Sequence, residues 1–283
     1  WPHRKPHRFW WIDILLLAAL AGGIVAAAEV AGRWQGALRP EVVIDLSPWA
    51  LPKYALLSLA RGLLAYGLSL AFTLGYGYWA AHDRRAERVL IPLLDILQSL
   101  PVLAFMPGFV LGLVHLFPGS NAGLELAAVL MIFTGQAWNM TFSYYASVRT
   151  VPRPLREAAA VFRISGWRAF RVVELPAAMI GLVWNSMMSM AGGWFFLTVT
   201  EAFRLGDKDF RLPGVGSYMA EAIHQGDGAA MVGGVVAMVV MIVGVDQLVW
   251  RPIVVWSQRF ELAETTGSAP RSWFLALLRR SRL

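Results

Sequence analysis

Few residues in this chain could carry out covalent chemistry or bind a metal ion. The 283 residues include no cysteine, which excludes disulfides, thiolate metal sites and a cysteine nucleophile. The five histidines are scattered, and His3 and His7 lie in a proline-interrupted terminus, so no metal site is predicted. None of the three lysines follows a glycine, which excludes a Gly-Lys-Ser/Thr phosphate loop. We therefore expect no catalytic residue and no cofactor here, and any ATP would be bound by another polypeptide or by another region of a longer one.

Polar side chains within apolar stretches are the remaining candidates for function. Arg61 is the clearest, because an arginine at the centre of a membrane helix costs about 2.5–3.5 kcal/mol on insertion scales. Either its side chain snorkels to the headgroups, or it lies near the outer mouth of a path and attracts an anion. Glu201 is expected at the outer end of its stretch, in water. Further path candidates, whose small and polar surroundings are as typical of helix packing as of a pore, are Asn139, Asn185, Ser189, Trp194 and Thr198.

The elements that would position these residues are membrane-spanning helices. With 57% hydrophobic residues, 15% charged residues and a mean hydropathy of +0.54, the chain is too apolar for an ordinary soluble domain. Pro101 and Pro107 are expected to interrupt one of the apolar stretches. The predicted fold class is all-α: a polytopic integral membrane protein of about six transmembrane helices. These are expected at residues 11–31, 54–81, 89–117, 122–146, 177–203 and 229–250.

The distribution of basic residues indicates how these helices are oriented. If both termini are cytoplasmic, 18 of the 25 Lys and Arg residues lie on the cytoplasmic side, 6 lie on the outer side, and Arg61 lies within a stretch. This threefold excess is the positive-inside pattern and predicts a multi-pass protein of a bacterial cytoplasmic membrane. It also accounts for the net charge of +7 without nucleic acid as a partner.

The segment between the fourth and fifth predicted helices, residues 149–176, carries most of the functional information. It is basic, amphipathic and helix-prone: Pro152 precedes a helix, Glu157-Ala158-Ala159-Ala160 favours its continuation, Ser165-Gly166 ends it, and Pro176 opens the next span. A plain connection between two membrane helices needs no helix of its own. A helix outside the membrane, on the positive side, is typical of a surface that docks a cytoplasmic partner.

This segment resembles the Glu-Ala-Ala loop of the permease subunits of type I ABC importers. In that family a glycine follows shortly after Glu-Ala-Ala, and a Leu-Pro stands nineteen residues downstream; Glu157-Ala158-Ala159 and Leu175-Pro176 keep that spacing. The usual glycine position, six after the glutamate, is Arg163 here, with Gly166 three residues later. That departure leaves the geometry of the turn open. The resemblance covers residues 54–260 and looks closest to the nitrate, sulfonate, taurine and bicarbonate branch.

The resemblance implies a coupling helix, from about Glu157 to Ser165, that sits in a cleft of a separate ATPase subunit binding ATP and Mg. It also implies a second permease half or subunit, surrounding membrane lipid, and a periplasmic or lipoprotein substrate-binding protein. That protein would deliver a small anionic solute of the nitrate, sulfonate, taurine or bicarbonate kind. That protein would dock near the turn at residues 213–216 and a short helix at 217–224. The residues implied in ATPase coupling are Glu157, Ala158, Ala159, Arg163, Ser165, Gly166, Leu175 and Pro176.

The chain divides into a segment with the first helix and an outer loop (1–52), the core permease domain (53–260) and a basic cytoplasmic tail or linker (261–283). The first helix also resembles a secretory signal, although its removal would separate the two most basic segments across the membrane. The amphipathic residues 271–283 and the initial Trp1 raise the alternative that the chain is half of a fused permease. Homodimer, heterodimer and fusion all remain open.

Two other function classes are alternatives to a permease subunit. An ion-coupled secondary transporter would show repeated spans with broken helices, and no two stretches here look like copies of each other. A membrane-bound enzyme is less favoured, because no catalytic residues stand out. Neither alternative gives the loop at 149–176 a purpose, and dependence on ATP would separate both from the permease interpretation.

Overall fold

A computed structural model of the protein describes residues 43–206, 208–260 and 272–274, together with single positions at 14, 17, 22, 28, 31, 32 and 34. Most of the predicted first membrane helix and of the basic tail lies outside the described residues. The other predicted helices fall within them, and most of the described chain is helical, as expected for the all-α class.

The helices follow one another with short connections. Three-residue 3-10 turns, η1 (Pro48–Ala50) and η4 (Gln258–Phe260), flank the described core, and a small antiparallel hairpin pairs β1 (Arg204–Leu205) with β2 (Lys208–Asp209). The α-helices are α2 (Leu51–His82), α3 (Arg84–Ser99), α4 (Val102–Leu116), α5 (Ala122–Thr134), α6 (Ala137–Arg149), α7 (Arg153–Val161), α8 (Gly166–Ala169), α9 (Leu175–Glu201), α10 (Val215–Gln225), α11 (Gly228–Val245) and α12 (Arg251–Ser257).

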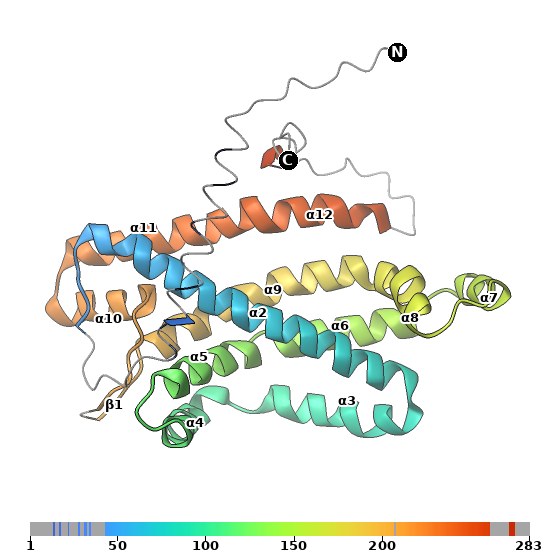
Figure 1. Ribbon diagram of the computed structural model, residues 1–283, viewed down its shortest axis with the longest axis horizontal. Helices are drawn as coiled ribbons and strands as arrows, with labels where there is room; N and C mark the ends of the chain where they lie inside the picture. Colours follow the sequence, from blue (N-terminus) through green and yellow to red (C-terminus); the bar gives the residue numbers. More distant parts are fainter. Residues whose placement is uncertain are drawn as a thin grey trace, which may run out of the picture.

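The long helices run side by side along one axis of the molecule (Figure 1). α6 packs along both α2 and α9, α5 packs on α2, and α11 and α12 cover α2 and α9. α7, α8 and the α2–α3 connection lie at one end, which we call the inner end; α4, α10 and the hairpin lie at the other, the outer end (Figure 1). The described basic residues that were assigned to the cytoplasmic side belong to segments of the inner end.

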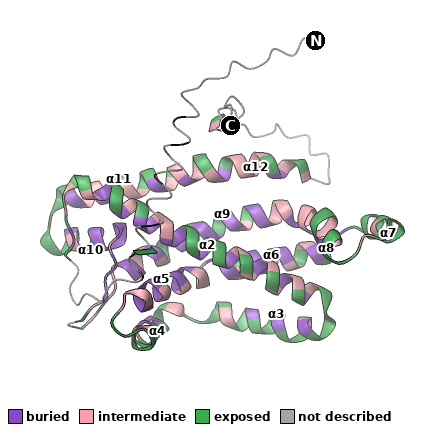
Figure 2. Cartoon of the chain, viewed as in Figure 1, coloured by how far each residue is buried: buried purple, intermediate pink, exposed green. Residues whose placement is uncertain are grey.

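Among the residues that the structure describes, three helices are long and apolar enough to cross a membrane: Pro48–His82, Gly166–Glu201 and Gly228–Phe260. The pair α3 and α4 would make a fourth crossing if it is counted as one span. Apolar side chains on α11 face outward, among them Val232, Val236 and Val240, each more than half exposed (Figure 2). Such a face suits contact with lipid, so the structure agrees with a multi-pass membrane protein.

The predicted third helix is broken, as its prolines suggested. α3 and α4 meet at an angle of 94° across Leu100 and Pro101. Proline restricts the residue before it to extended conformations, and Leu100 is extended, with φ −70° and ψ 131°. The expected second interruption, at Pro107, is wrong because Pro107 lies inside α4.

The predicted fourth helix is also broken, at a place that no proline marks. α5 ends before Gly135 and α6 begins after Gln136, so the stretch 122–146 is not one continuous helix. α9 passes close to this break: a Cβ on Gly193 would overlap the Gln136 side chain, and one on Gly135 would overlap the Phe196 ring. Here the small residues of α9 serve helix packing, one of the two expected roles.

Two π-helical segments each end two residues before a proline. η2 (Phe170–Glu174) leads to Pro176, and η3 (Asp246–Trp250) leads to Pro252. The N–H that follows each segment bonds to a carbonyl five residues back. Because a proline ring collides with the carbonyl four residues before it, the wider π turn leaves room for the ring. Both helices therefore continue through their prolines.

We predict that Gly193→Val destabilises the protein, because the larger side chain would displace Gln136, which bonds Ser69 at 3.3 Å. Overpacking of this kind typically costs about 1–3 kcal/mol. Gly67→Val on α2 is the matched control, since no atom lies within 4 Å of a Cβ there. Thermal unfolding in detergent would measure both variants, and equal melting temperatures would contradict this account of the α9 packing.

Candidate functional site

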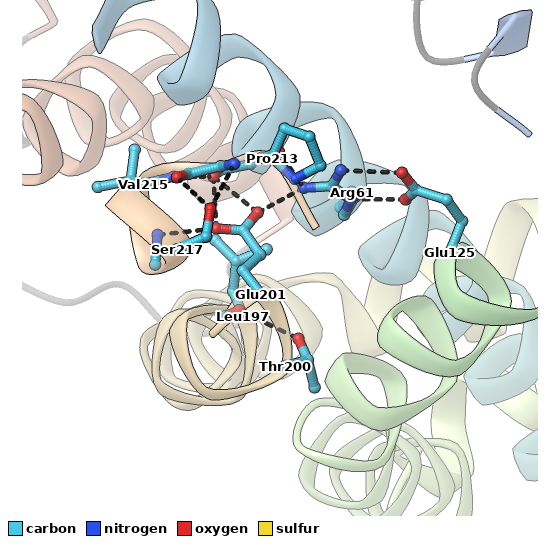
Figure 3. A network of polar contacts seen from close by, with 11 residues as sticks. Arg61, Glu125, Leu197, Thr200, Glu201, Pro213, Val215 and Ser217 are labelled. Atoms are coloured by element: carbon cyan, nitrogen blue, oxygen red, sulfur yellow. Dashed lines mark hydrogen bonds and ion pairs between the residues drawn. The ribbon is translucent and has the colours of Figure 1, made fainter. Parts of the chain in front are cut away.

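Arg61 lies where α2, α5 and α9 meet, with its side chain only 1% exposed. Its Nε and Nη2 donate to the two carboxylate oxygens of Glu125 at 2.6 and 2.8 Å. Its Nη1 donates to Glu201 at 2.6 Å and to the carbonyl of Pro213 at 2.9 Å (Figure 3). The bidentate pair uses the planar fork of the guanidinium, which a lysine could not reproduce. The snorkelling interpretation of Arg61 is therefore wrong: the charge is held within the protein.

Glu201, the last residue of α9, is the second centre of this network and is fully buried. Besides Arg61, it binds the Ser58 hydroxyl at 2.7 Å and the backbone N–H of Gly216 at 2.9 Å. The Ser58 oxygen in turn accepts the N–H of Val215 at 2.9 Å. These N–H groups belong to the first turn of α10, which has no intrahelical partners for them. Glu201 and Ser58 thus cap α10 from other helices, and the expectation that Glu201 is hydrated is wrong.

The turn that leads into α10 requires glycine because the backbones come so close. A Cβ on Gly214 would overlap the Glu201 carboxylate, and a Cβ on Gly216 would lie 2.5 Å from the carbonyl oxygen of Thr198. The backbone of Gly214 is extended, so close approach and not backbone conformation explains this glycine. The turn and the short helix predicted at 213–224 are confirmed in position, and the glycines are what lets α10 reach Glu201.

The network holds one cation and two carboxylates, so at full ionisation it carries a net negative charge. An uncompensated buried charge is costly, and the N-terminal end of α10 offsets it with partial positive charge. The guanidinium of Arg61 is already engaged by Glu125 and Glu201 and has almost no exposed surface. In this structure Arg61 therefore does not face a path through which an anion could approach.

The other predicted path residues on α6 and in the middle of α9 differ in their exposure. Asn139 on α6 is exposed, whereas Ser189 on α9 is only 2% exposed. Asn185, one turn before Ser189, donates from Nδ2 to the Ser143 hydroxyl of α6 at 3.0 Å. That bond joins two packed helices, which is a common role of polar residues in membrane proteins.

The remaining path candidates lie nearer the outer end of α9. Trp194 is half-buried, and its ring approaches to 3.5 Å of where a Cβ on Gly62 would stand. Thr198 is also half-buried and donates to carbonyls of its own helix. The structure thus gathers these candidates along α6 and α9 without assigning any of them to a path, and their role stays a prediction.

The inner end carries the loop that resembles the Glu-Ala-Ala motif. α7 projects from the bundle and has no buried residue (Figures 1 and 2). Glu157 and Ala158 are exposed and Ala159 is half-buried. Within the described residues, the Glu157 carboxylate has neither a hydrogen bond nor an ion pair. A carboxylate and small residues on a projecting helix leave room for another molecule to approach closely.

α7 ends at Val161, whereas the predicted coupling helix extended to about Ser165. Its end is a Schellman turn: the N–H of Ile164 bonds the carbonyl of Ala159 at 2.8 Å, and the N–H of Arg163 bonds that of Ala160 at 3.0 Å. Arg163 has φ of 53°, the left-handed conformation that glycine adopts most easily. The turn therefore has the geometry expected for the family's glycine, although arginine occupies the position.

The other residues implied in coupling are spread behind α7. Ser165 is exposed before α8, and Gly166, with φ of 54°, begins α8. Leu175 and Pro176 begin α9 and are half-buried. The structure thus places the Glu-Ala-Ala residues on the projecting surface and the Leu-Pro pair at the base of the loop.

Three exposed apolar side chains of this loop were not singled out from the sequence. Val161, Phe162 and Trp167 are 79%, 76% and 68% exposed. Apolar residues this exposed, in a basic loop beyond the membrane helices, are typical of a surface that another protein covers. The sequence does contain an indication of their exposure. They are apolar residues among Arg, Glu and Ala, in a segment too short and too charged to cross a membrane.

A cavity of about 310 Å³ lies behind α7, between that helix and the inner ends of α2 and α6. Its walls include His82 of α2, whose Nε2 lies 2.8 Å from Glu174 of η2 and whose Nδ1 lies 2.8 Å from the carbonyl of Tyr78. Each ring nitrogen of His82 therefore has an oxygen within hydrogen-bond distance, one on the backbone of α2 and one on η2. The second oxygen of Glu174 is buried without a hydrogen bond.

Charged side chains also cluster at the outer end, beside the hairpin. Arg211 pairs with Asp209 and Glu221, and Arg204 pairs with Glu221 at 3.2 Å. Burial opposes ionisation of Asp209, but its hydrogen bonds with Arg211 outweigh burial and lower its pKa. The side chain of Gln225 and then that of Arg211 lower the pKa of Glu221. Asp209 and Glu221 are therefore ionised near neutral pH, and their ion pairs with the two arginines hold the hairpin against α10.

We predict that Arg61→Met lowers the free energy of unfolding by about 3–5 kcal/mol, because it leaves two buried carboxylates without their cation. Adding Glu125→Gln to Arg61→Met should recover part of that loss. The control is Arg204→Met, whose ion pair is 40% exposed on the arginine side and worth less than about 1 kcal/mol. Unfolding of the detergent-solubilised variants measures these free energies. If Arg61→Met lowers the free energy of unfolding no more than Arg204→Met does, the role assigned to Arg61 is disproved.

We further predict that Arg163→Gly stabilises the end of α7 by about 1 kcal/mol, because glycine adopts the left-handed conformation without the steric cost. Arg163→Ala removes the same charged side chain but keeps the Cβ, so it is the control. Hydrogen exchange at the amides of Arg163 and Ile164 would slow in the glycine variant only. Equal exchange in both variants would show that the turn is not limited by this conformation.

Several curated proteins are similar in sequence to this chain. They include the putative aliphatic sulfonates transport permease protein SsuC of Bacillus subtilis, 28% identical over 51% of this chain and 50% of its own length. The riboflavin transport system permease protein RibX of Chloroflexus aurantiacus is 31% identical over 60% of this chain and 58% of its own. The bicarbonate transport system permease protein CmpB of Synechococcus elongatus is 25% identical over 70% and 66%. This chain thus spans from half to just under two-thirds of the length of these relatives.

A family model covers one continuous part of the chain. The model of binding-protein-dependent transport system inner membrane components matches residues 73–249, from the last third of α2 into η3. The match includes α7, α9 and α10. Relatives named for sulfonate and bicarbonate transport agree with the branch that the sequence indicated. The chain therefore belongs to the family of binding-protein-dependent transport system inner membrane components, the permease subunits of ABC importers that its Glu-Ala-Ala loop resembles.

Proposed function

We propose that this permease component carries a small anionic solute across the bacterial cytoplasmic membrane and that α7 couples it to a separate ATPase subunit. The observation that carries the proposal is α7 itself: a helix without buried residues that projects from the inner end and bears exposed Val161 and Phe162. A connection between two membrane helices gains nothing from exposing these side chains. A cleft on a partner would bury them, and at roughly 25 cal/mol per Å² such burial would contribute to binding.

The inner end would face the cytoplasm, with both chain termini on that side. Basic residues of the inner end, including Arg84, Arg85 and Arg168, support this orientation through the positive-inside rule. ATP and Mg would be bound by the partner, because the chain lacks a Gly-Lys-Ser/Thr loop. A second permease half, whether a copy, a different subunit or a fused segment, would complete the translocation path beside the exposed faces of α6 and α9.

The outer end would receive the solute from a substrate-binding protein. The hairpin and α10 lie at this end, and the ion pairs of Arg211 with Asp209 and Glu221 join them. We favour a small anion because the similar proteins include permeases named for sulfonate and bicarbonate transport. The relative named for riboflavin makes a larger solute the second candidate, to be distinguished by uptake assays with each compound.

The test is co-purification of an ATPase subunit with the detergent-solubilised complex from its native host. Val161→Asp combined with Phe162→Asp should abolish co-purification, because two charges would replace the apolar surface that the partner buries. The retained subunit should hydrolyse ATP, and mass spectrometry should identify a Gly-Lys-Ser/Thr phosphate loop in it.

Trp49→Asp is the matched control for this experiment, since Trp49 is an aromatic residue 91% exposed at the opposite, outer end. It should leave the ATPase bound. If both variants keep the subunit while remaining folded, α7 is not the docking surface. If the unchanged protein carries no ATPase, coupling of this chain to ATP hydrolysis is refuted.

A further inference from the structure

Arg156, next to Glu157 on α7, makes a contact that neither the motif nor the family match explains. Its Nη2 donates to the carbonyl of Val148 and to the carbonyl of Arg149, both at 2.9 Å. These are the last carbonyls of α6. Among the described residues, Arg156 is the one side chain of α7 with a hydrogen bond or ion pair to the rest of the protein.

The chemistry of a helix end explains why this contact forms. The final carbonyls of an α-helix have no intrahelical donors and carry partial negative charge, so a guanidinium is a favourable partner. The connection from α6 to α7 offers few donors of its own, because Pro152 has no N–H. Arg156 reaches back across this connection and supplies donors to α6.

Without that contact, little would hold α7 against α6. α7 has no buried residue, and the cavity of about 310 Å³ lies between it and the inner ends of α2 and α6. Arg156, Ala159 and Ala160 line that cavity on the α7 side. A force applied to α7 could therefore tilt it into the cavity, and the bonds of Arg156 oppose this movement.

α6, in contrast, is firmly joined to the bundle. Tyr144 is fully buried between α6 and its neighbours, the Thr141 hydroxyl lies 3.1 Å from that of Thr73 on α2, and Ser143 bonds Asn185 of α9 at 3.0 Å. A displacement that reaches the end of α6 is thus passed to α2 and α9. These are the helices that meet at the buried Arg61 network of the outer end.

We propose that Arg156 is the positioning residue that makes α6 move with α7 when the ATPase moves the coupling helix. This inference rests on the proposed function, because it needs a partner that displaces α7. Its role differs from that of Val161 and Phe162: they face the partner, whereas Arg156 faces the protein's own α6. Loss of Arg156 should leave the ATPase bound and separate ATP hydrolysis from transport.

The experiment compares Arg156→Gln with Arg153→Gln. Both remove one positive charge from α7, but in the described structure Arg153 has neither a hydrogen bond nor an ion pair. In the complex reconstituted in proteoliposomes with its binding protein, Arg156→Gln should reduce solute taken up per ATP hydrolysed at least fivefold, and Arg153→Gln less than twofold. Arg156→Lys should recover part of the ratio, since an ammonium also donates to helix-end carbonyls.

Hydrogen exchange of the permease alone distinguishes failure of the proposal for Arg156 from failure of the proposed function. The α7 amides should exchange several-fold faster in Arg156→Gln than in Arg153→Gln, whether or not an ATPase binds. Equal exchange, or an unchanged ratio of uptake to hydrolysis, overturns the proposal for Arg156. Loss of ATPase co-purification in Arg156→Gln also overturns it, because Arg156 would then be a docking residue. If no ATPase binds the unchanged chain, the proposed function fails, and the coupling role falls with it even where exchange confirms the contact.

Discussion

The buried contact of Arg61 with Glu125 and Glu201 is the interaction on which the outer half of the molecule depends. A guanidinium inside an apolar bundle is tolerated only when nearly all of its donors are bonded, and here two carboxylates and the carbonyl of Pro213 meet that need. Because Glu125 belongs to α5 and Glu201 to α9, three helices must converge on one point. The excess negative charge then favours the N-terminal end of α10 as a fourth element, since that end offers N–H groups.

This convergence dictates where side chains must be absent. Gly214 and Gly216 allow the α10 backbone to come against Glu201, and Gly193 allows α9 to pass the break between α5 and α6. Close approach also explains why the fifth apolar stretch is rich in small residues without requiring them to line a pore. α9 connects these features: it ends at Glu201 in the buried network and begins at Leu175 beneath the loop that carries α7.

The two ends of the bundle differ in how tightly their elements are packed. The outer end is closed by buried charges, whereas the inner end presents a helix with no buried residues and a cavity behind it. Segments with few buried contacts are those that move at least cost. The exposed surface that we propose for a partner and the limited attachment to α6 therefore belong to the same short helix, α7.

Hydropathy, proline positions and basic residues are local properties, and they by themselves determined the all-α membrane class, the approximate ends of α2 and α9, the bend before Pro101 and the helical loop around Glu157. The spacing from Glu157 to Leu175-Pro176, which is also read directly from the sequence, indicated the permease family. Only the tertiary structure decided the state of Arg61 and Glu201, which are 140 residues apart. From the sequence alone, each of these charged residues is expected to be hydrated. The free energy of a buried charge depends on partners from other helices, which the sequence does not show. The break at Gly135 and the hydrogen bonds of Arg156 to the end of α6 could likewise not be predicted from the sequence, since both depend on a neighbouring helix.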